Sequence, residues 1–388
     1  MPLRFMTAGE SHGPTVTAIL EGIPAGLKLD ASLLNPELAR RQKGFGAGGR
    51  MKIERDKLTI LSGIMEGKTI GMPISLLVEN LNHKQWKEKE TPPMTAPRPG
   101  HADLTGAVKY GYNDLRPSLE RASARETTMR VAVGAICKTF LAEFGIIVGG
   151  YVRSIGEVDA DFGETKFKSR FDAAEKNDIR CPDAEAAEMM RARINACIRE
   201  KDTLGGVIEI VALDVPVGLG SFAQWDTRLE AKLAQAVMSV QAIKGVEIGD
   251  AFENARLPGT KAHDAIVLDD ENLVRPTNRA GGIEGGISNG EPIIIRAAMK
   301  PIASTLTPQK TVDLVSGETR ETTYERSDFC PVPRAVPVLE AVVAITLADA
   351  LIEKLGGDSI AEMKTRFATL KKTKLSDFDL DNEPHIFW

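Results

Sequence analysis

Two histidines stand in loop-like segments bounded by glycine, where a side chain can reach a ligand. His12 lies in the pentapeptide GESHG at 9–13, and His101 ends the segment TPPMTAPRPGH at 91–101. An imidazole gains and loses a proton near neutral pH, so either ring could serve as a general acid or base. The remaining histidines, His83, His263 and His385, have no such setting, and we interpret them as structural.

The pentapeptide GESHG also matches G-x-S-x-G, the nucleophile elbow of serine hydrolases. An elbow requires a strand that turns directly into a helix. Here residues 3–6 and the β-branched run 14–20 both favour strands. We therefore expect a loop between two strands, with Ser11 as a binding hydroxyl. A serine hydrolase with Ser11 as nucleophile is the enzymatic alternative, and a fluorophosphonate probe would label it.

Arginines gather in the same kinds of segment. A guanidinium grips carboxylate and phosphate groups with two parallel hydrogen bonds, and a helix start is a natural anion site. Asp328 lies within RSDFCPVPRAVP, either as a functional carboxylate or as a structural partner of an arginine. The arginines predict a pocket for a small polyanion: Arg40, Arg41, Arg50, Arg98, Arg121, Arg125, Arg130, Arg326 and Arg334. One alternative is that most of them are solvated surface groups. Another is that they bind anions in a non-catalytic flavin- or phosphometabolite-binding protein.

Several function classes lack support. The long loops 43–52, 91–101 and 279–292 contain neither G-x-G-x-x-G after a strand nor a P-loop. The four cysteines show no C-x-x-C, so we expect no metal site, and Cys330 is interpreted as a buried spectator thiol. A net charge of −5 argues against nucleic acid. The chain has no uninterrupted apolar run of ~18–20 residues and no secretory signal, so we expect a cytoplasmic protein without a membrane partner.

The elements that must position these residues follow from periodicity and capping signals. No linker or repeat divides the 388 residues, which predicts one intertwined α/β domain over residues 1–388. We expect helices starting at Asn35 (N-cap) and Pro36, from Ser118 to about Phe144 with Gly145 as the stop, and over 183–201, 226–244 (ended by Gly245) and 334–354 (ended by Gly356). We expect strands at 59–65, 71–78, 206–218 and 292–299, and a hairpin over 310–325 that turns at Ser316 and Gly317.

Eight ordered blocks, taken together, resemble the chorismate synthase family along nearly the whole chain. They are far more specific than any one motif: TAGESHG, RRQKGFGAGGRMK, PRPGHADL, ERASARETTMRVAVGA, AIKGVEIGDAF, GGIEGGISNG, MKPIAST and RSDFCPVPRAVPVLEA.

The resemblance implies a reaction, a cofactor and a fold. The reaction is the anti-1,4-elimination of phosphate from 5-enolpyruvylshikimate 3-phosphate to give chorismate, the last step of the shikimate pathway of aromatic amino acid biosynthesis. The cofactor is reduced FMN, with NADPH as an external source of reductant. The fold is a mixed α/β (α+β) one, a β-α-β sandwich with helices packed against antiparallel-rich sheets, in a homotetramer.

The resemblance also implies roles for individual residues. His12 would protonate the departing phosphate, His101 would protonate the reduced flavin, and Asp328 would assist removal of the C6 hydrogen through flavin N5. Substrate contacts would fall on Ser11, His12, Arg41, Arg50, Arg98, Arg125 and Arg326. Flavin contacts would fall on Arg121, Ala122, Ser123, Gln241, Ala242, Gly285, Lys300, Pro301, Ile302, Ala303, Ser304 and Arg326.

The chain departs from the family pattern at two positions. Ala47 stands in the Gly-rich loop where a second arginine is common, which weakens any dinucleotide contact there. Ala122 stands where serine is common, a change that a backbone contact tolerates. Neither departure touches the expected acid and base groups.

Overall fold

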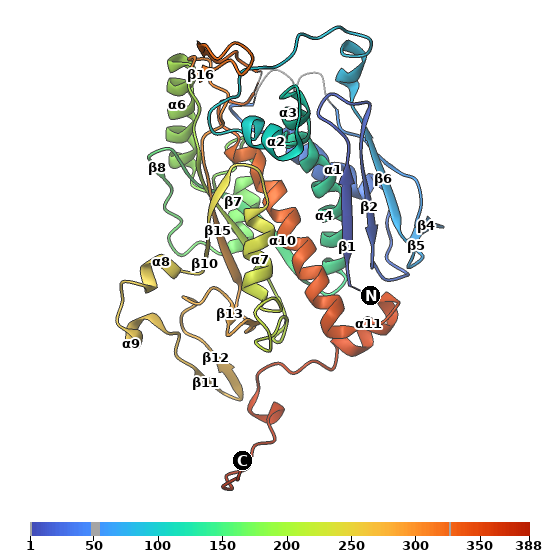
Figure 1. Cartoon of the computed structure of the whole chain (residues 1–388). Coiled ribbons are helices and arrows are strands. Elements are labelled where there is room, and N and C mark those ends of the chain that lie inside the picture. The colour runs from blue at the N-terminus through green and yellow to red at the C-terminus, as the bar shows by residue number, and fades with distance from the viewer. Residues whose placement is uncertain (1, 48–54, 326) are drawn as a thin grey trace.

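A computed structural model describes residues 2–47, 55–325 and 327–388 of the chain. Arg50 and Arg326, both expected in the site, lie outside the described residues. Within the described chain, a layer of helices lies between two antiparallel β-sheets (Figure 1). This arrangement confirms the expected mixed fold of helices packed against antiparallel sheets.

The first sheet is built from the N-terminal part of the chain. Its strands are all antiparallel and lie in the order β1 (Arg4–Ala8), β2 (Thr15–Glu21), β6 (Ile74–Glu79) and β3 (Leu58–Ile60). Side chains alternate along β2, where Val16, Ala18 and Leu20 are buried. One face of this sheet therefore packs on the helices, and β1 and β2 form a hairpin whose loop contains GESHG.

The second sheet is antiparallel as well and more deeply buried. Its strand order is β10 (Ile243–Ile248), β15 (Ile293–Met299), β9 (Gly206–Leu213), β7 (Ile147–Ile155) and β8 (Val158–Asp159). Helices α5 (Phe167–Ala174) and α6 (Ala184–Glu200) pack on its outer side against β7 and β8. Coverage on both faces explains why β7 and β9 are buried along nearly their whole length.

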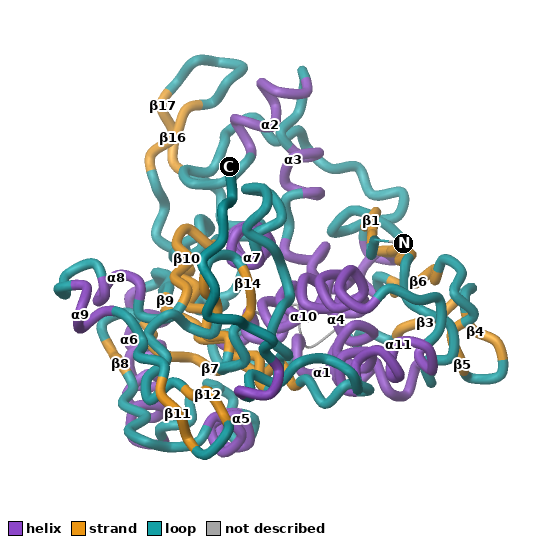
Figure 2. Tube along the Cα trace, turned by 90° about the horizontal axis from the view of Figure 1, so that it is seen from below, coloured by secondary structure: helices purple, strands orange, loops and turns teal. Residues whose placement is uncertain are grey.

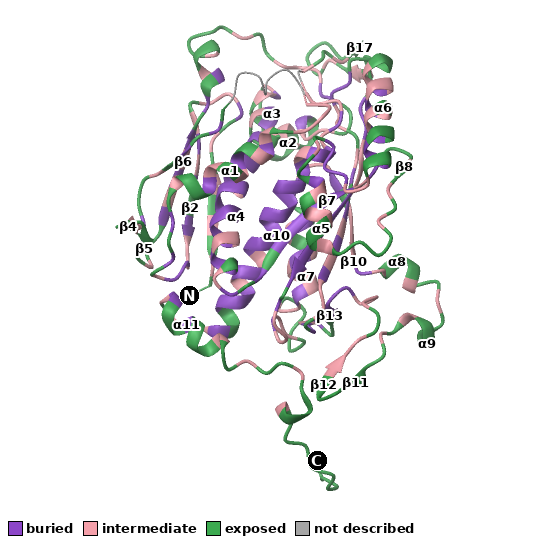
Figure 3. Ribbon diagram, turned by 180° about the vertical axis from the view of Figure 1, so that it is seen from behind, coloured by how far each residue is buried: buried purple, intermediate pink, exposed green. Residues whose placement is uncertain are grey.

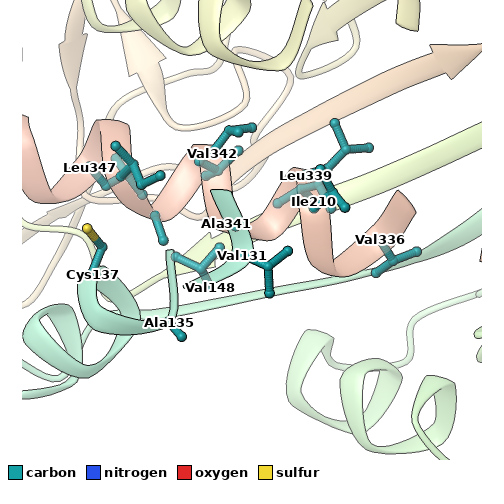
Figure 4. Packing of buried hydrophobic residues seen from close by; sticks show 14 of the residues in the cluster. Val131, Ala135, Cys137, Val148, Ile210, Val336, Leu339, Ala341, Val342 and Leu347 are labelled. Atoms are coloured by element: carbon teal, nitrogen blue, oxygen red, sulfur yellow. The ribbon is translucent and has the colours of Figure 1, made fainter. Parts of the chain in front are cut away.

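The helix layer consists of α1 (Ala31–Gln42), α4 (Thr127–Ala142), α7 (Leu229–Met238) and α10 (Val332–Leu355). Helix α4 packs on β2 and β6, and α10 packs on β7 and β9 (Figure 2). The two helices approach closely at Gly134, where a Cβ atom would lie 2.3 Å from that of Ala341. Figure 4 shows Ala341 among the buried side chains of this core. Glycine at this position lets α4 and α10 join the two sheets into one core.

Helix α10 is long and apolar enough to cross a membrane by length and composition alone. In the structure, however, 89% of its most apolar window is buried inside the protein (Figure 3). It is the central helix of the core, and its apolar composition reflects contacts on all sides.

Shorter elements complete the described chain. They are β4 (Ile64–Met65), β5 (Lys68–Thr69), η2 (Leu81–Gln85), α2 (Asp103–Tyr110), α3 (Arg116–Arg121), η3 (Ala124–Glu126), α8 (Ala251–Asn254), α9 (Gly259–Ala262), β11 (Val267–Asp269), β12 (Asn272–Val274), β13 (Ile283–Glu284), β14 (Ile287–Ser288), β16 (Lys310–Val312), β17 (Thr319–Glu321), α11 (Ile360–Phe367) and η4 (Leu375–Asp377).

Two predicted helices are confirmed, and the start of a third is wrong. The segments 183–201 and 334–354 correspond to α6 and α10, and α10 ends before Gly356 as expected. Helix α1 begins at Ala31 rather than after Asn35, because Asp30 caps it by accepting hydrogen bonds from the next turn. Asn35 instead accepts a hydrogen bond from the backbone of Leu58, at 2.9 Å.

The single helix predicted from Ser118 to about Phe144 is wrong, because the chain divides into α3, η3 and α4. The break lies at Ser123, whose backbone is extended (φ −65°, ψ 144°) and whose hydroxyl caps η3. The helix predicted at 226–244 is also too long. It ends at Met238, Ala242 takes a left-handed φ of 68°, and the chain continues as β10, so Gly245 lies in a strand and stops no helix.

The predicted strands 206–218 and 292–299 are confirmed as β9 and β15, although β9 ends at Leu213. The strand predicted at 71–78 begins only at Ile74, as β6. The segment 59–65 is two strands, because Gly63 takes a φ of 86° between them. The hairpin over 310–325 pairs as β16 and β17, but its loop spans 313–318, so the tight turn at Ser316 and Gly317 is wrong.

Candidate active site

The residues expected to do chemistry meet at the upper end of the sandwich in Figure 1, near α2, α3 and the start of α10. Two cavities, of about 430 and 460 Å³, adjoin there. Both are within the size range of small-molecule sites. They share the lining residues Arg41, His101, Ala124, Ile302, Asp328 and Arg334.

The first cavity is the more polar of the two and is called the polar cavity below. Besides the shared residues, Trp86, Lys89, Leu119 and Glu325 contribute to its lining. It brings together the three expected catalytic residues, most of the expected substrate contacts and several flavin contacts: Ser11, His12, Arg41, Arg98, His101, Ser123, Arg125, Ile302, Ser304 and Asp328.

The second cavity has largely apolar walls, formed by Val240, Ile243, Met299, Ala335 and Val338. The expected flavin contacts that it gathers are Ala122, Gln241, Ala242, Lys300, Ile302 and Ala303.

The remaining expected residues line neither cavity. Arg121 borders a shallower hollow of about 340 Å³ with Thr7 and Arg130, and its guanidinium donates to the carbonyl of Thr7 at 3.0 Å. Gly285 lies between β13 and β14. Pro301 follows Lys300 without contributing to either lining.

His12 is held by one carboxylate. Glu120 lies 2.7 Å from ring atom Nδ1 through Oε1 and accepts the backbone N–H of His12 through Oε2, at 2.8 Å. The ring packs against Trp86 with centroids 4.2 Å apart. Burial alone would raise the pKa of Glu120, but the hydrogen bonds from His12 outweigh it and lower the pKa below the usual range. Glu120 is therefore ionised at neutral pH and acts as an acceptor.

His101 has a different surrounding. Its Nδ1 lies 2.6 Å from Oδ1 of Asp103, a fully buried carboxylate. Arg98 clamps the same carboxylate with two side-chain hydrogen bonds of 2.8 and 2.9 Å. Burial opposes ionisation of Asp103, yet Arg98 and His101 hold its pKa well below the usual range. An ionised Asp103 accepts only, so Nδ1 of His101 carries the proton between them.

Arg41 and Arg125 form a buried cationic wall. Asp56 lies between them, 3.3 Å from Arg41 and 2.5 Å from Arg125. Burial lowers the pKa of Arg41 to about 9, Asp56 opposes this, and Arg334 and Arg125 add to it. One carboxylate thus serves two guanidinium groups, and this wall of the polar cavity favours an anionic ligand.

Asp328 lies on the wall that the two cavities share. Its carboxylate pairs with the guanidinium of Arg334, which also donates through Nε to the carbonyl of Arg41 at 3.2 Å. The expected pairing with an arginine is observed, with Arg334 as the partner, and the functional role of Asp328 stays a prediction.

Ser11 lies in the loop between two antiparallel strands, so the strand-to-helix turn of a nucleophile elbow is absent. Its hydroxyl accepts a hydrogen bond from Ser123 at 3.1 Å, while the ring of His12 bonds to Glu120. The structure therefore does not support Ser11 as the nucleophile of a serine hydrolase.

Comparison with known proteins decides the family. The family model described as chorismate synthase matches residues 3–352. The chain belongs to the chorismate synthase family. It is 51% identical over 382 residues to the chorismate synthase of Geobacter sulfurreducens, covering 94% of this chain and 97% of that one. It is 49% identical over 388 residues to that of Sulfurihydrogenibium sp., covering 96% and 100%.

A solved structure agrees. The crystal structure of a chorismate synthase superposes with a TM-score of 0.78 at 44% identity, covering 95% of this chain and 97% of the other. The resemblance drawn from the eight blocks is confirmed, and so is the enzyme class: the chain is a lyase of the shikimate pathway, as its family is.

Four residues of this chorismate synthase site were not identified from the sequence: Asp56, Trp86, Asp103 and Glu120. Asp103 and Glu120 stand inside the blocks PRPGHADL and ERASARETTMRVAVGA, two residues after His101 and one before Arg121. The spacing H-x-D could have suggested a carboxylate for His101. Nothing local pairs Glu120 with His12, because the two are joined only by the fold.

The cysteines play no evident part in the chemistry. All four are buried, as expected for Cys330, and burial raises the pKa of the Cys330 thiol to about 12. Within residues 2–47, 55–325 and 327–388, no group of three or more His, Cys, Asp or Glu side chains is arranged to hold a metal ion.

Proposed function

We propose that the chain catalyses the anti-1,4-elimination of phosphate from 5-enolpyruvylshikimate 3-phosphate, giving chorismate, with reduced FMN bound beside the substrate. The observation that carries the proposal is the pair of adjoining cavities. One is lined by arginines, the other is apolar, and His101 and Asp328 lie on the wall between them. A charged substrate and a flat, apolar ring system would thus lie in contact.

The polar cavity suits the substrate's phosphate and two carboxylates. Arg41, Arg98 and Arg125 are all buried, and each is already oriented by protein partners. Guanidinium groups held in place before binding stabilise charge without reorganisation. By resemblance, Arg50 and Arg326 would add to this set.

His12 is the proposed donor to the departing phosphate. Its Nδ1 is engaged by Glu120, so Nε2 is the ring atom left to exchange a proton with a ligand. As the allylic C–O bond breaks, its electron pair leaves on the phosphate oxygen, which takes the proton from Nε2. A positioned general acid contributes ~10²–10⁴-fold to such a step.

The residues of the second cavity fit a flavin. The side-chain oxygen Oε1 of Gln241 is buried and has no hydrogen-bond partner among the described residues, so it can accept an N–H of a ligand. Ala242 holds a left-handed φ of 68°, a strained conformation typical of ligand sites. Reduced FMN, when bound, would supply electron density for the allylic cleavage and recover it each turnover. His101, at its edge, would hold or release a proton through Nε2.

The wider proposal follows the family. It treats residues 1–388 as one catalytic domain in a cytoplasmic homotetramer that needs no nucleic acid or membrane partner, with NADPH as an external source of reductant.

The test is phosphate release under anaerobic conditions. We expect release and chorismate formation with the substrate plus photoreduced FMN, and negligible release with oxidised FMN. Tight binding of both ligands without phosphate release would support the alternative of a non-catalytic binding protein.

A further inference from the structure

Glu120 devotes both carboxylate oxygens to a single residue. Oε1 lies 2.7 Å from Nδ1 of His12, and Oε2 accepts the backbone N–H of His12 at 2.8 Å. Because Glu120 bonds both the ring and the backbone N–H of His12, it fixes the position of the ring relative to the loop. The side chains are 14% exposed for Glu120 and 18% for His12, so water competes little for these bonds.

The surroundings of His12 leave it few other positions. Trp86 packs on its ring, and Nδ1 of His83 donates to the His12 carbonyl at 2.9 Å. The charged groups nearby are cations around Trp86: the guanidinium of Arg116 lies 5.8 Å from the centre of that ring and the ammonium of Lys89 5.4 Å. Cations cannot accept a hydrogen bond from the imidazole, and Glu120 is the acceptor that the described residues supply.

The position of the ring proton follows. Glu120 is ionised and can only accept, so the proton on the 2.7 Å contact belongs to Nδ1. In a neutral imidazole with Nδ1–H, Nε2 is the acceptor, and in the protonated ring Nε2–H is the donor. No partner of Nε2 occurs among the described residues, and His12 lines the polar cavity.

We propose that Glu120 is the positioning residue for His12: it fixes the ring and its tautomer, so that Nε2 alone exchanges the proton with the substrate. Glu120 does not line either cavity and acts through His12. The role of the proton rests on the proposed function, while the tautomer is a property of the ligand-free protein.

The experiment combines nitrogen NMR with kinetics. Protein labelled with ¹⁵N-histidine is measured without ligand at alkaline pH, and the His12 signals are assigned from their loss in His12→Ala. We expect a protonated Nδ1 and an unprotonated Nε2 in the wild type, and a mixture of tautomers in Glu120→Gln. We also expect kcat to fall about tenfold or more in Glu120→Gln, up to the ~10²–10⁴-fold that a general acid contributes, with KM changed less than about twofold.

Two variants sharpen the result. Glu120→Asp keeps the charge and should retain the wild-type tautomer and part of the lost kcat. Glu157→Gln, which removes an exposed carboxylate paired with Arg193, is the matched control and should change neither reading.

The outcomes are distinct. An unchanged tautomer in Glu120→Gln overturns the inference, even when kcat falls, because the loss would then be merely structural. If Glu120→Gln does not fold, the wild-type spectrum and the kcat of Glu120→Asp decide: an unprotonated Nδ1 in the wild type, or a Glu120→Asp kcat equal to the wild-type value, overturns the inference. Absence of chorismate formation by the wild type would refute the proposed function, and the nitrogen spectra would still decide the positioning role.

Discussion

Each of the two site histidines is paired with one carboxylate, but the two carboxylates differ in what else they bond. Glu120 bonds His12, and among the described residues no arginine is hydrogen-bonded to it, whereas Asp103 is also clamped by Arg98. Nη2 of Arg98 also lies 3.0 Å from Nδ1 of His101. Glu120 therefore serves one histidine, whereas Asp103 serves a histidine and an arginine at once.

The largest expected effect comes from removing either ring. His12→Ala and His101→Ala should each lower turnover by ~10²–10⁴-fold, the range of a lost general acid. Flavin binding should largely survive, since the apolar walls of the second cavity remain. The measurement is single-turnover chorismate formation with FMN binding as control, and turnover like that of the wild type in either variant would remove that histidine from the mechanism.

The next largest effect is on protein stability, where replacing Asp103 should cost more than replacing Glu120. Asp103→Asn should lower the free energy of unfolding by about 3–5 kcal/mol, because it leaves the buried Arg98 without its counter-ion. Glu120→Gln should cost much less, since its partner is a half-buried histidine. Urea unfolding of both variants measures the difference. Equal decreases in the free energy of unfolding would mean that the two pairs contribute equally to stability.

The same contrast predicts a pH dependence. The pKa of Asp103 is lowered in the folded protein, so its contribution to stability is present above its unfolded pKa of ~3.9 and is lost as the pH falls below that value. Urea midpoints measured from pH ~6 to pH ~3 should therefore fall more steeply for the wild type than for Asp103→Asn. Parallel curves would assign the acid sensitivity to other carboxylates.

The smallest effect concerns Ser11, the neighbour of His12. As a binding hydroxyl, it contributes about one neutral hydrogen bond, so Ser11→Ala should lower kcat/KM by about 2- to 13-fold, equivalent to 0.5–1.5 kcal/mol. A fluorophosphonate probe should leave the wild type unlabelled. Complete loss of activity together with labelling at Ser11 would restore the hydrolase alternative.

Sequence patterns predicted much of the fold, and failed where tertiary contacts decide. The apolar composition of 334–354 predicts a buried helix, and Asp183 is a good N-cap residue at the start of the helix predicted at 183–201. The break at Ser123 could not be foreseen, because its helix-compatible neighbours give no signal and its hydroxyl bonds to Ser11. The left-handed Ala242 was missed for a similar reason, since the backbone hydrogen bond that its carbonyl accepts, from the N–H of Lys300 at 2.9 Å, comes from a distant segment.

The candidate site shows the same division. The histidines and arginines could be named from glycine-bounded loops and from the family blocks, because their residue types carry the chemistry. Their partners could not: Asp56 and Glu120 are ordinary acids in the sequence, and the fold brings them to Arg41, Arg125 and His12 from distant segments.

The most direct test of the account is the stoichiometry of reductant in one sealed anaerobic cuvette. Elimination of phosphate is redox-neutral, so reduced FMN should be required without being consumed. We predict chorismate formation over many turnovers with no net loss of reductant and negligible formation with oxidised FMN. Consumption of one reductant per chorismate, or full activity without any flavin, would contradict the account.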